Sequence, residues 1–136
     1  MERVPATRTG ENGPRRILIV EDEILIRKLI AEALRDSGYV VVEAGTADEA
    51  VAFIASQQRV DAVFTDVKLP GSMNGIQLAE RIRKNHPQIK VLVTSGHVDH
   101  RVLKRVDKFL AKPYRLEELV RKIAQLFSDT SDRADE

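Results

Sequence analysis

The sequence predicts an α/β fold with a doubly wound, five-stranded parallel sheet and helices on both of its faces. Two observations lead to this prediction. Short apolar runs, typical of strands buried on both sides, alternate along the chain with stretches whose apolar residues recur at helical spacing. Because crossovers between parallel strands are right-handed, this alternation favours a sheet sandwiched between helices.

Five segments are predicted as strands. Each is a short apolar run bounded by charged or polar residues: RILIV, YVVVEA, DAVFTD, KVLVTS and KFLAK, at residues 16–20, 39–44, 61–66, 90–95 and 108–112. In a parallel sheet the carboxyl ends of the strands lie along one edge, where open α/β sheets bind ligands. We therefore expect the functional residues at that edge.

The first two helices are predicted from apolar spacing and from their caps. The first has six apolar residues that recur at helical spacing and ends at Gly38 in a left-handed cap: Leu25, Ile26, Leu29, Ile30, Ala33 and Leu34. The second begins at Thr46, because TADE has the spacing of a capping box, with Glu49 three residues later. Its apolar face continues with Ala50, Val51 and Ile54.

The later helices differ in strength. A third carries Ile76, Ala79 and Ile82 and stops before Pro87. The segment that follows residue 96 offers few apolar positions, which predicts a fourth helix that is short or weak: Val98, Val102, Leu103 and Val106. The C-terminal helix has the clearest amphipathic stripe: Leu116, Leu119, Val120, Ile123 and Leu126.

The 136-residue chain is long enough for one ordinary domain, which we place at residues 15–127. Residues 1–14 and 128–136 lack apolar periodicity and are expected to be flexible tails. The net charge of +1 offers no general attraction to nucleic acid or anionic membranes. Without cysteine there is no disulfide, thiolate nucleophile or sulfur-based zinc site. No apolar run approaches the roughly 18 residues of a membrane span, so we expect a cytoplasmic protein.

Polar residues end several predicted strands. Glu21 and Asp22 follow the first strand and Asp66 ends the third, while the fourth and fifth strands lead into other polar groups: Thr94, Ser95 and Lys112. A helix cap would explain any one of them, but their joint placement indicates a site. Clustered carboxylates suit a hard cation such as Mg²⁺, and an ammonium group with a hydroxyl suits the oxygens of a phosphoryl group.

Four motifs occur in order at these strand ends: IVEDE, FTDVKLPGSMNG, VTSG and FLAKPY. Together they resemble the receiver domain of two-component response regulators, which has a flavodoxin-like fold, over residues 15–127. The resemblance implies that Asp66 is the phosphoacceptor. It also implies a Mg²⁺ (or Mn²⁺) ion ligated by Asp22, Asp66 and the backbone carbonyl of Lys68, with Glu21 acting through water.

The resemblance implies further roles at the other strand ends. Ser95, or its neighbour Thr94, and Lys112 would bind phosphoryl oxygens. Pro113 corresponds to the position of a cis peptide bond. Phe109 takes the place of an aromatic switch residue whose rotamer follows Ser95, although ordinary core packing would also explain it.

The sequence departs from the usual receiver pattern in three places. Glu21 replaces a commoner Asp, and the loop from Asp66 to Gly75 is one residue longer and has Asn74 in place of a frequent Asp. The segment from Ser95 to Lys112 is shorter than usual, in agreement with a weak fourth helix. The histidines are expected to be solvent-exposed rather than to form a metal site: His86, His97 and His100.

We therefore expect a single-domain response regulator, a monomer or weak homodimer, rather than an enzyme acting on a separate substrate. Its donor would be a histidine kinase or a histidine phosphotransfer protein, and it would signal to an unknown protein target. One alternative is a degenerate receiver that binds partners without phosphorylation. A Mg²⁺-dependent phosphohydrolase is disfavoured, because its usual acid two residues after the nucleophile is Lys68 here. A flavin or nucleotide binder would need a Gly-rich phosphate loop after a strand.

Overall fold

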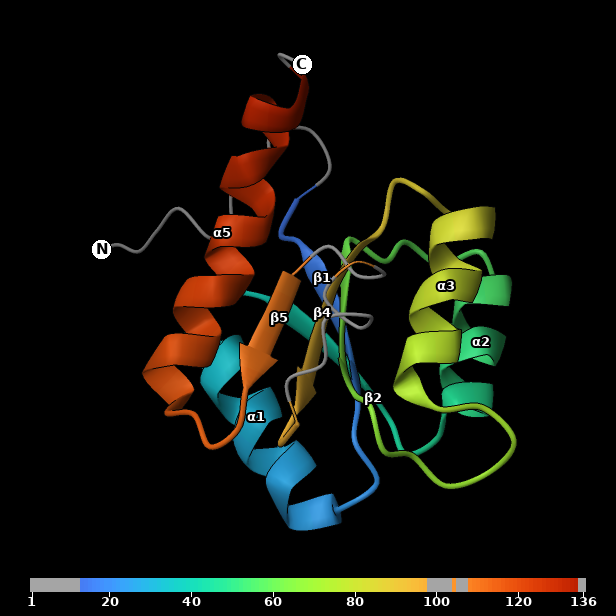
Figure 1. Cartoon of the computed structure of the whole chain (residues 1–136). Coiled ribbons are helices and arrows are strands. Elements are labelled where there is room, and N and C mark those ends of the chain that lie inside the picture. Colours follow the sequence, from blue (N-terminus) through green and yellow to red (C-terminus); the bar gives the residue numbers. More distant parts are fainter. Residues whose placement is uncertain (1–12, 98–103, 105–107, 135–136) are drawn as a thin grey trace.

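The computed structural model describes residues 13–97, 104 and 108–134, and its centre is a parallel sheet (Figure 1). The strands are β1 (Arg16–Val20), β2 (Val40–Ala44), β3 (Ala62–Asp66), β4 (Lys90–Ser95) and β5 (Lys108–Ala111). They pair in the order β2-β1-β3-β4-β5. This order is that of flavodoxin-like folds and confirms the predicted fold class.

Helices cover the sheet on both sides. They are α1 (Ile24–Asp36), α2 (Ala47–Ala55), α3 (Gly75–Asn85) and α5 (Leu116–Ala134). In Figure 1, α1 and α5 lie on one face and α2 and α3 on the other. The predicted fourth helix, with Val98, Val102, Leu103 and Val106, lies outside the described residues.

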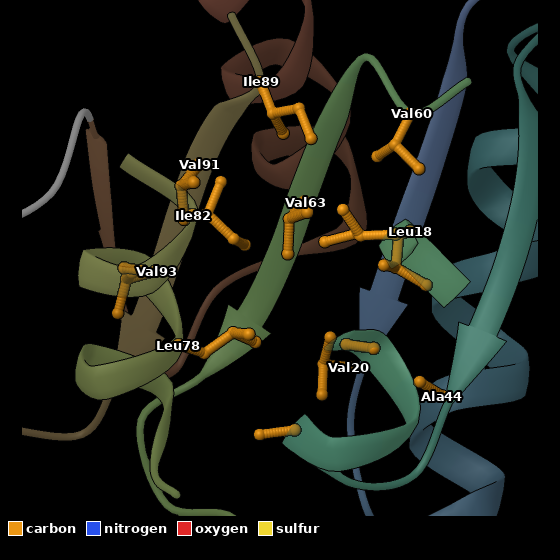
Figure 2. Packing of buried hydrophobic residues seen from close by; sticks show 14 of the residues in the cluster. Leu18, Val20, Ala44, Val60, Val63, Leu78, Ile82, Ile89, Val91 and Val93 are labelled. Carbon is orange, nitrogen blue, oxygen red and sulfur yellow. The ribbon is translucent and has the colours of Figure 1, made fainter. Parts of the chain in front are cut away.

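Each face of the sheet has its own apolar core. Side chains from alternate positions of the strands pack against α2 and α3 in one cluster, including Leu18, Val63 and Val91 (Figure 2). The intervening side chains, such as Ile17 and Phe64, pack against α1 and α5 on the other face. This double burial explains why the strands read as continuous apolar runs in the sequence.

The predicted helix caps are present with one change of detail. The Thr46 side chain accepts a hydrogen bond from the backbone N–H of Glu49 at 3.1 Å. The Glu49 carboxylate accepts its bond from the N–H of Gly45 at 2.7 Å, one residue before the expected partner. Gly38 has a φ of 100°, the left-handed conformation predicted for the end of α1.

The apolar residues that predicted α1 do not all face the core. Ile30 and Leu34 are buried, but Leu25 is 79% exposed and Leu29 is 56% exposed. At 3.6 residues per turn, Leu25 and Leu34 lie about half a turn apart, so these residues cannot share one face. The buried stripe instead includes Ala31, and Ile24, Leu25 and Leu29 form a second, exposed stripe.

Helix α5 continues without interruption to Ala134, seven residues past the domain boundary predicted after residue 127. The last residues of α5 that belong to the core are Leu126 and the partly buried Phe127. Extending an existing helix costs much less than nucleating one, so a polar segment can prolong a helix that packing has already fixed. In the part of the chain that the structure describes, no helix combines the length and the apolar character that crossing a membrane requires.

A pair of leucine and isoleucine truncations tests this assignment of buried and exposed faces. Ile123→Ala removes a fully buried side chain and is expected to lower the free energy of unfolding by about 2–5 kcal/mol. Leu25→Ala, on the exposed stripe of α1, is expected to change it by no more than about 0.5 kcal/mol. Urea denaturation measures both, and a large loss for Leu25→Ala would contradict the exposed position.

Candidate functional site: a carboxylate edge paired with Lys112

The candidate site lies where the connections of two neighbouring strands diverge. β1 and β3 are adjacent in the sheet. After β1 the chain enters α1 on one face, and after β3 it leads to α3 on the other (Figure 1). Such a switch point opens a crevice beyond the carboxyl ends of the strands. Glu21 and Asp66 lie at this crevice.

Asp66 is the last residue of β3, and its carboxylate is held on both oxygens. Oδ2 accepts a hydrogen bond from Nζ of Lys112 at 2.7 Å, a charge-assisted contact of short length. Oδ1 accepts a longer bond from the backbone N–H of Lys68 at 3.3 Å. Asp66 lies at the carboxyl edge of the sheet and is mostly buried, with 8% of its surface exposed.

Lys112 reaches Asp66 from the end of β5, across β4. Its backbone N–H donates to the carbonyl oxygen of Ser95 at 3.0 Å, which extends the pairing between the two strands by one residue. The Lys112–Pro113 peptide bond is cis, the conformation that the resemblance implied at this position. The sheet thus brings together two residues that are 46 positions apart in the sequence.

Two further carboxylates adjoin this pair. Glu21 is buried, and its Oε2 accepts a hydrogen bond from the backbone N–H of Glu23 at 3.0 Å, whereas Asp22 is exposed. Burial is the largest cause that raises the pKa of Glu21, and the charges of Asp66 and Asp22 raise it further against the opposing effects of the Glu23 N–H and Lys112. The acids are therefore close enough to repel one another.

The two hydroxyl residues at the end of β4 differ in what they contact. The hydroxyl of Thr94 is buried and donates to the carbonyl oxygen of Leu110 at 2.7 Å, which ties β4 to β5. The hydroxyl of Ser95 lies at the edge of the sheet and accepts a bond from the N–H of His97 at 3.1 Å. Ser95 is thus the better placed of the two to meet a ligand at the edge.

The long loop after Asp66 is fixed at its far end by α3. Asn74 caps α3 in a complete capping box with Gln77, which explains why an amide works at this position. Gly75 passes so close to β3 that a Cβ there would overlap the backbone carbonyl of Asp66. Its N–H also donates to the carbonyl oxygen of Val67 at 2.8 Å. Only glycine permits this approach.

Two aromatic residues flank the site. Phe109 is partly buried and packs against the core cluster on the α2 and α3 face. Tyr114 stacks edge-on against Phe64, with ring centroids 6.1 Å apart. Burial, followed by the charges of Glu21 and Asp66, raises the pKa of Tyr114 to about 12, so its phenol stays neutral beside the acids.

The donor set fits a hard cation that keeps part of its water shell. Glu21, Asp22 and Asp66 supply oxygen atoms and mutual repulsion that a divalent cation would relieve. Within the described ranges, no three His, Asp or Glu side chains converge closely enough to hold a metal ion by themselves. A cation at this edge would therefore need water or backbone oxygen as further ligands. His86 ends α3 and His97 follows β4, whereas His100 lies outside the described residues.

Comparison with known proteins identifies the family. The family model described as "Response regulator receiver domain" matches residues 17–124. The chain belongs to the response regulator receiver domain family. A solved structure agrees with this membership. The response regulator protein TrrA of Thermotoga maritima, in complex with Mg²⁺-BeF, has a TM-score of 0.74 at 30% identity, over 82% of this chain and 98% of that one.

Two curated relatives share the receiver domain within longer chains, and a further solved structure matches over nearly its whole length. The transcriptional regulatory protein PdtaR of Mycobacterium tuberculosis is 37% identical over 85% of this chain and 58% of its own length. A cyclic di-GMP phosphodiesterase of Thermotoga maritima is 35% identical over 79% of this chain but only 29% of its own length. A CheY-like receiver from Methanospirillum hungatei has a TM-score of 0.77 at 29% identity, covering 87% of this chain and 98% of that one. The receiver thus spans less than two thirds of the curated relatives named here.

Sequence reasoning missed three residues around the site: Arg27, Gly75 and Tyr114. Arg27 donates to the carbonyl oxygen of Glu21 at 2.9 Å. Gly75 carried a recognisable signal, because NGIQ has the spacing of a capping box with glycine in the first helical turn. Arg27 and Tyr114 carried no signal in the sequence, because the residues that they contact lie on other elements.

The raised pKa of Glu21 predicts how its charge affects stability. Because the folded pKa of Glu21 lies above the unfolded value of 4.5, ionisation of Glu21 destabilises the fold. The stability that protonated Glu21 contributes is fully present below pH 4.5 and is lost as pH rises through the folded pKa. In metal-free buffer, Glu21→Gln is therefore expected to raise the melting temperature at pH 7.5 and to have little effect at pH 4.

Thermal denaturation with and without Mg²⁺ checks this expectation. Glu23→Gln, the same change at an exposed carboxylate of the same turn, is the matched control and should show a smaller gain. Equal gains from both variants, or a gain for Glu21→Gln that persists at pH 4, would contradict a cost specific to the buried Glu21 charge.

Proposed function

We propose that this receiver accepts a phosphoryl group on Asp66 from a phosphohistidine donor, in a reaction that depends on Mg²⁺ or Mn²⁺. The observation that carries the proposal is the 2.7 Å contact between Asp66 and Lys112 beside two more carboxylates, in a chain of the receiver family. In this arrangement the Asp66 carboxylate would accept the group, and the Lys112 ammonium beside it would stabilise the incoming negative charge.

The transfer replaces one bond to phosphorus by another. A carboxylate oxygen of Asp66 attacks the phosphorus atom, the P–N bond to the donor imidazole breaks, and the imidazole nitrogen keeps the electron pair. Bound Mg²⁺ supplies neutralisation of the charge on the transferred group. Asp22, Asp66 and the carbonyl of Lys68 would hold the ion, with Glu21 acting through water, as the resemblance implied. The TrrA complex with Mg²⁺-BeF supports such a site.

Lys112 and Ser95 would hold the transferred group from the side of β4 and β5. The Lys112 ammonium now pairs with Asp66 and would turn to a phosphoryl oxygen once Asp66 becomes an ester. Ser95 would donate its hydroxyl to another oxygen. We assign this role to Ser95 rather than Thr94, because the Thr94 hydroxyl already donates to Leu110. The movement of Ser95 would then leave room for Phe109 to change rotamer and alter the surface that partners bind.

The donor protein would dock on the exposed apolar stripe of α1. Ile24, Leu25 and Leu29 begin directly after the acidic turn and are more than half exposed. Beside them, a groove of about 320 Å³ runs between α1 and the start of α5, with Lys112 at its wall: Ile26, Leu29, Ile30, Pro113, Tyr114 and Leu116. An apolar surface next to the acceptor fits a protein donor better than a free metabolite. A histidine kinase or phosphotransfer protein fits this description.

Phosphorylation with a small donor tests the chemistry alone. With acetyl phosphate and Mg²⁺, the wild-type receiver is expected to gain the mass of one phosphoryl group, and Asp66→Asn none. Lys112→Ala is expected to slow the reaction about 100-fold, because it removes a preorganised charge. Intact-mass spectrometry measures all three proteins. Absence of an adduct on the wild type would sink the proposal and favour a binding module that works without phosphorylation.

Transfer from a protein donor tests the docking surface. The double variant Leu25→Ser with Leu29→Ser is expected to react with acetyl phosphate at the wild-type rate. Its transfer from a radiolabelled histidine phosphotransfer protein should fall about tenfold or more, as expected for a central apolar contact. Val40→Ser, at an exposed apolar residue on the opposite end of the sheet, is the control. Equal transfer to both variants would exclude the α1 stripe.

A further inference from the structure

The guanidinium of Arg27 joins the acidic turn after β1 to strand β2. From the first turn of α1, its Nη1 donates to the carbonyl oxygen of Glu21 at 2.9 Å, and its Nε donates to Oε1 of Glu43 at 3.1 Å. Only 16% of the side chain is exposed. One side chain therefore spans the turn that carries Glu21 and Asp22 and the neighbouring strand.

With Arg27 in place, the N–H, the carbonyl oxygen and one carboxylate oxygen of Glu21 all have hydrogen-bond partners. Its N–H donates to the carbonyl oxygen of Ala44 at 3.0 Å, and its carboxylate accepts from the N–H of Glu23. The carbonyl oxygen, whose orientation sets the direction of the next peptide and so of Asp22, is held by Arg27. Without this bond the turn would be anchored on one side only.

The Arg27 side chain is itself positioned by its ion pair with Glu43 and by the room that Gly45 leaves for it. Glu43 is mostly buried on β2 and contacts three cations: Arg27, Lys28 and Arg35. Burial alone would raise the pKa of Glu43, but the hydrogen bonds from Arg27 and Lys28 and the charges of Lys28 and Arg35 lower it. At Gly45 an added Cβ would lie 3.3 Å from Nη1, so the absence of a side chain there leaves room for the guanidinium.

Of these three cations, Arg27 alone reaches the acidic turn in the described part of the chain. Arg35 also bonds Glu43, at 3.5 Å, and a backbone carbonyl, but that carbonyl belongs to Val41 on β2. Lys28 is largely exposed and contacts Glu43 at 3.3 Å. An ion pair that served stability alone would not need the extra bond to Glu21. The geometry therefore separates Arg27 from its two neighbours.

We infer that Arg27 is a positioning residue for the metal site: by fixing the Glu21 carbonyl, it directs the carboxylates of Glu21 and Asp22 toward Asp66. The inference rests on the proposed function. Carboxylates that repel one another turn toward solvent when their backbone is free. Cation binding is then weakened by the free energy needed to bring these carboxylates together. Arg27 lowers this cost by holding the turn in its binding conformation, as outer-shell partners of metal ligands do. Lysine cannot replace it, because a single ammonium lacks the fork that bonds two partners in fixed directions.

The experiment measures Mg²⁺ affinity by titration of backbone amide NMR shifts, with the melting temperature of each metal-free protein measured alongside. Arg27→Gln is expected to raise the dissociation constant of Mg²⁺ about tenfold or more. Arg35→Gln is the matched control, since it also removes one bond to Glu43 and one to a backbone carbonyl, and should change the constant less than about twofold. Arg27→Lys keeps the charge beside Glu43 and is expected to regain stability without regaining Mg²⁺ affinity.

The possible outcomes separate this inference from the proposed function. If Arg27→Gln lowers the melting temperature but leaves Mg²⁺ affinity unchanged, Arg27 is structural only and the inference is wrong. Equal loss of affinity in Arg27→Gln and Arg35→Gln, or full recovery in Arg27→Lys, also overturns it. If the wild-type protein does not bind Mg²⁺, the proposed function and the inference fail together. If Arg27→Gln does not fold, the Mg²⁺ affinity of Arg27→Lys is compared with that of Arg35→Gln. Weaker affinity in Arg27→Lys supports the inference, and equal affinity overturns it.

Discussion

Repulsion between carboxylates at one edge of the sheet is the constraint that shapes this molecule. Glu21, Asp22 and Asp66 lie along this edge because β1 and β3 are neighbours and their chains leave toward opposite faces. Lys112, which follows β5, offsets this repulsion, because its Nζ lies 2.7 Å from Oδ2 of Asp66. The core beneath is apolar on both faces of the sheet, so the charged residues are confined to the edge.

The backbone around these charges is fixed by close packing and by hydrogen bonds. Gly75 brings the start of α3 against the carbonyl of Asp66, and Thr94 ties β4 to β5 below Ser95. Arg27 holds the turn after β1 in the same way. Asp22 and Lys112, by contrast, have exposed side chains. Supporting contacts from the backbone and from neighbouring side chains are what a preorganised site requires.

The strands and the site were predictable because their signals are local in the sequence. A strand buried on both faces is a continuous apolar run, and a polar residue at its carboxyl end lies at the functional edge whatever the other strands do. The order of the motifs then sufficed to bring Asp66 and Lys112 together, although they are 46 residues apart.

The errors arose where local spacing leaves the answer open. α1 has apolar residues around most of its circumference, so spacing alone did not reveal that Leu25 faces solvent while Leu34 is buried. The end of α5 was missed because its last turns lack the apolar residues from which helices are read. The contact between Arg27 and Glu43 joins a helix to a strand, and charged residues at such a separation carry no periodic signal.

The path of α5 has a practical consequence. The helix starts beside the acidic edge, at Leu116, and runs back past the whole sheet to Ala134 at the opposite end of the domain (Figure 1). Phe127, near that end, contacts the ring of Tyr39, and the guanidinium of Arg15 lies 4.2 Å from its ring centre. A fluorophore attached at Ala134 would therefore lie at the opposite end of the domain from Asp66, away from the carboxyl edge of the sheet.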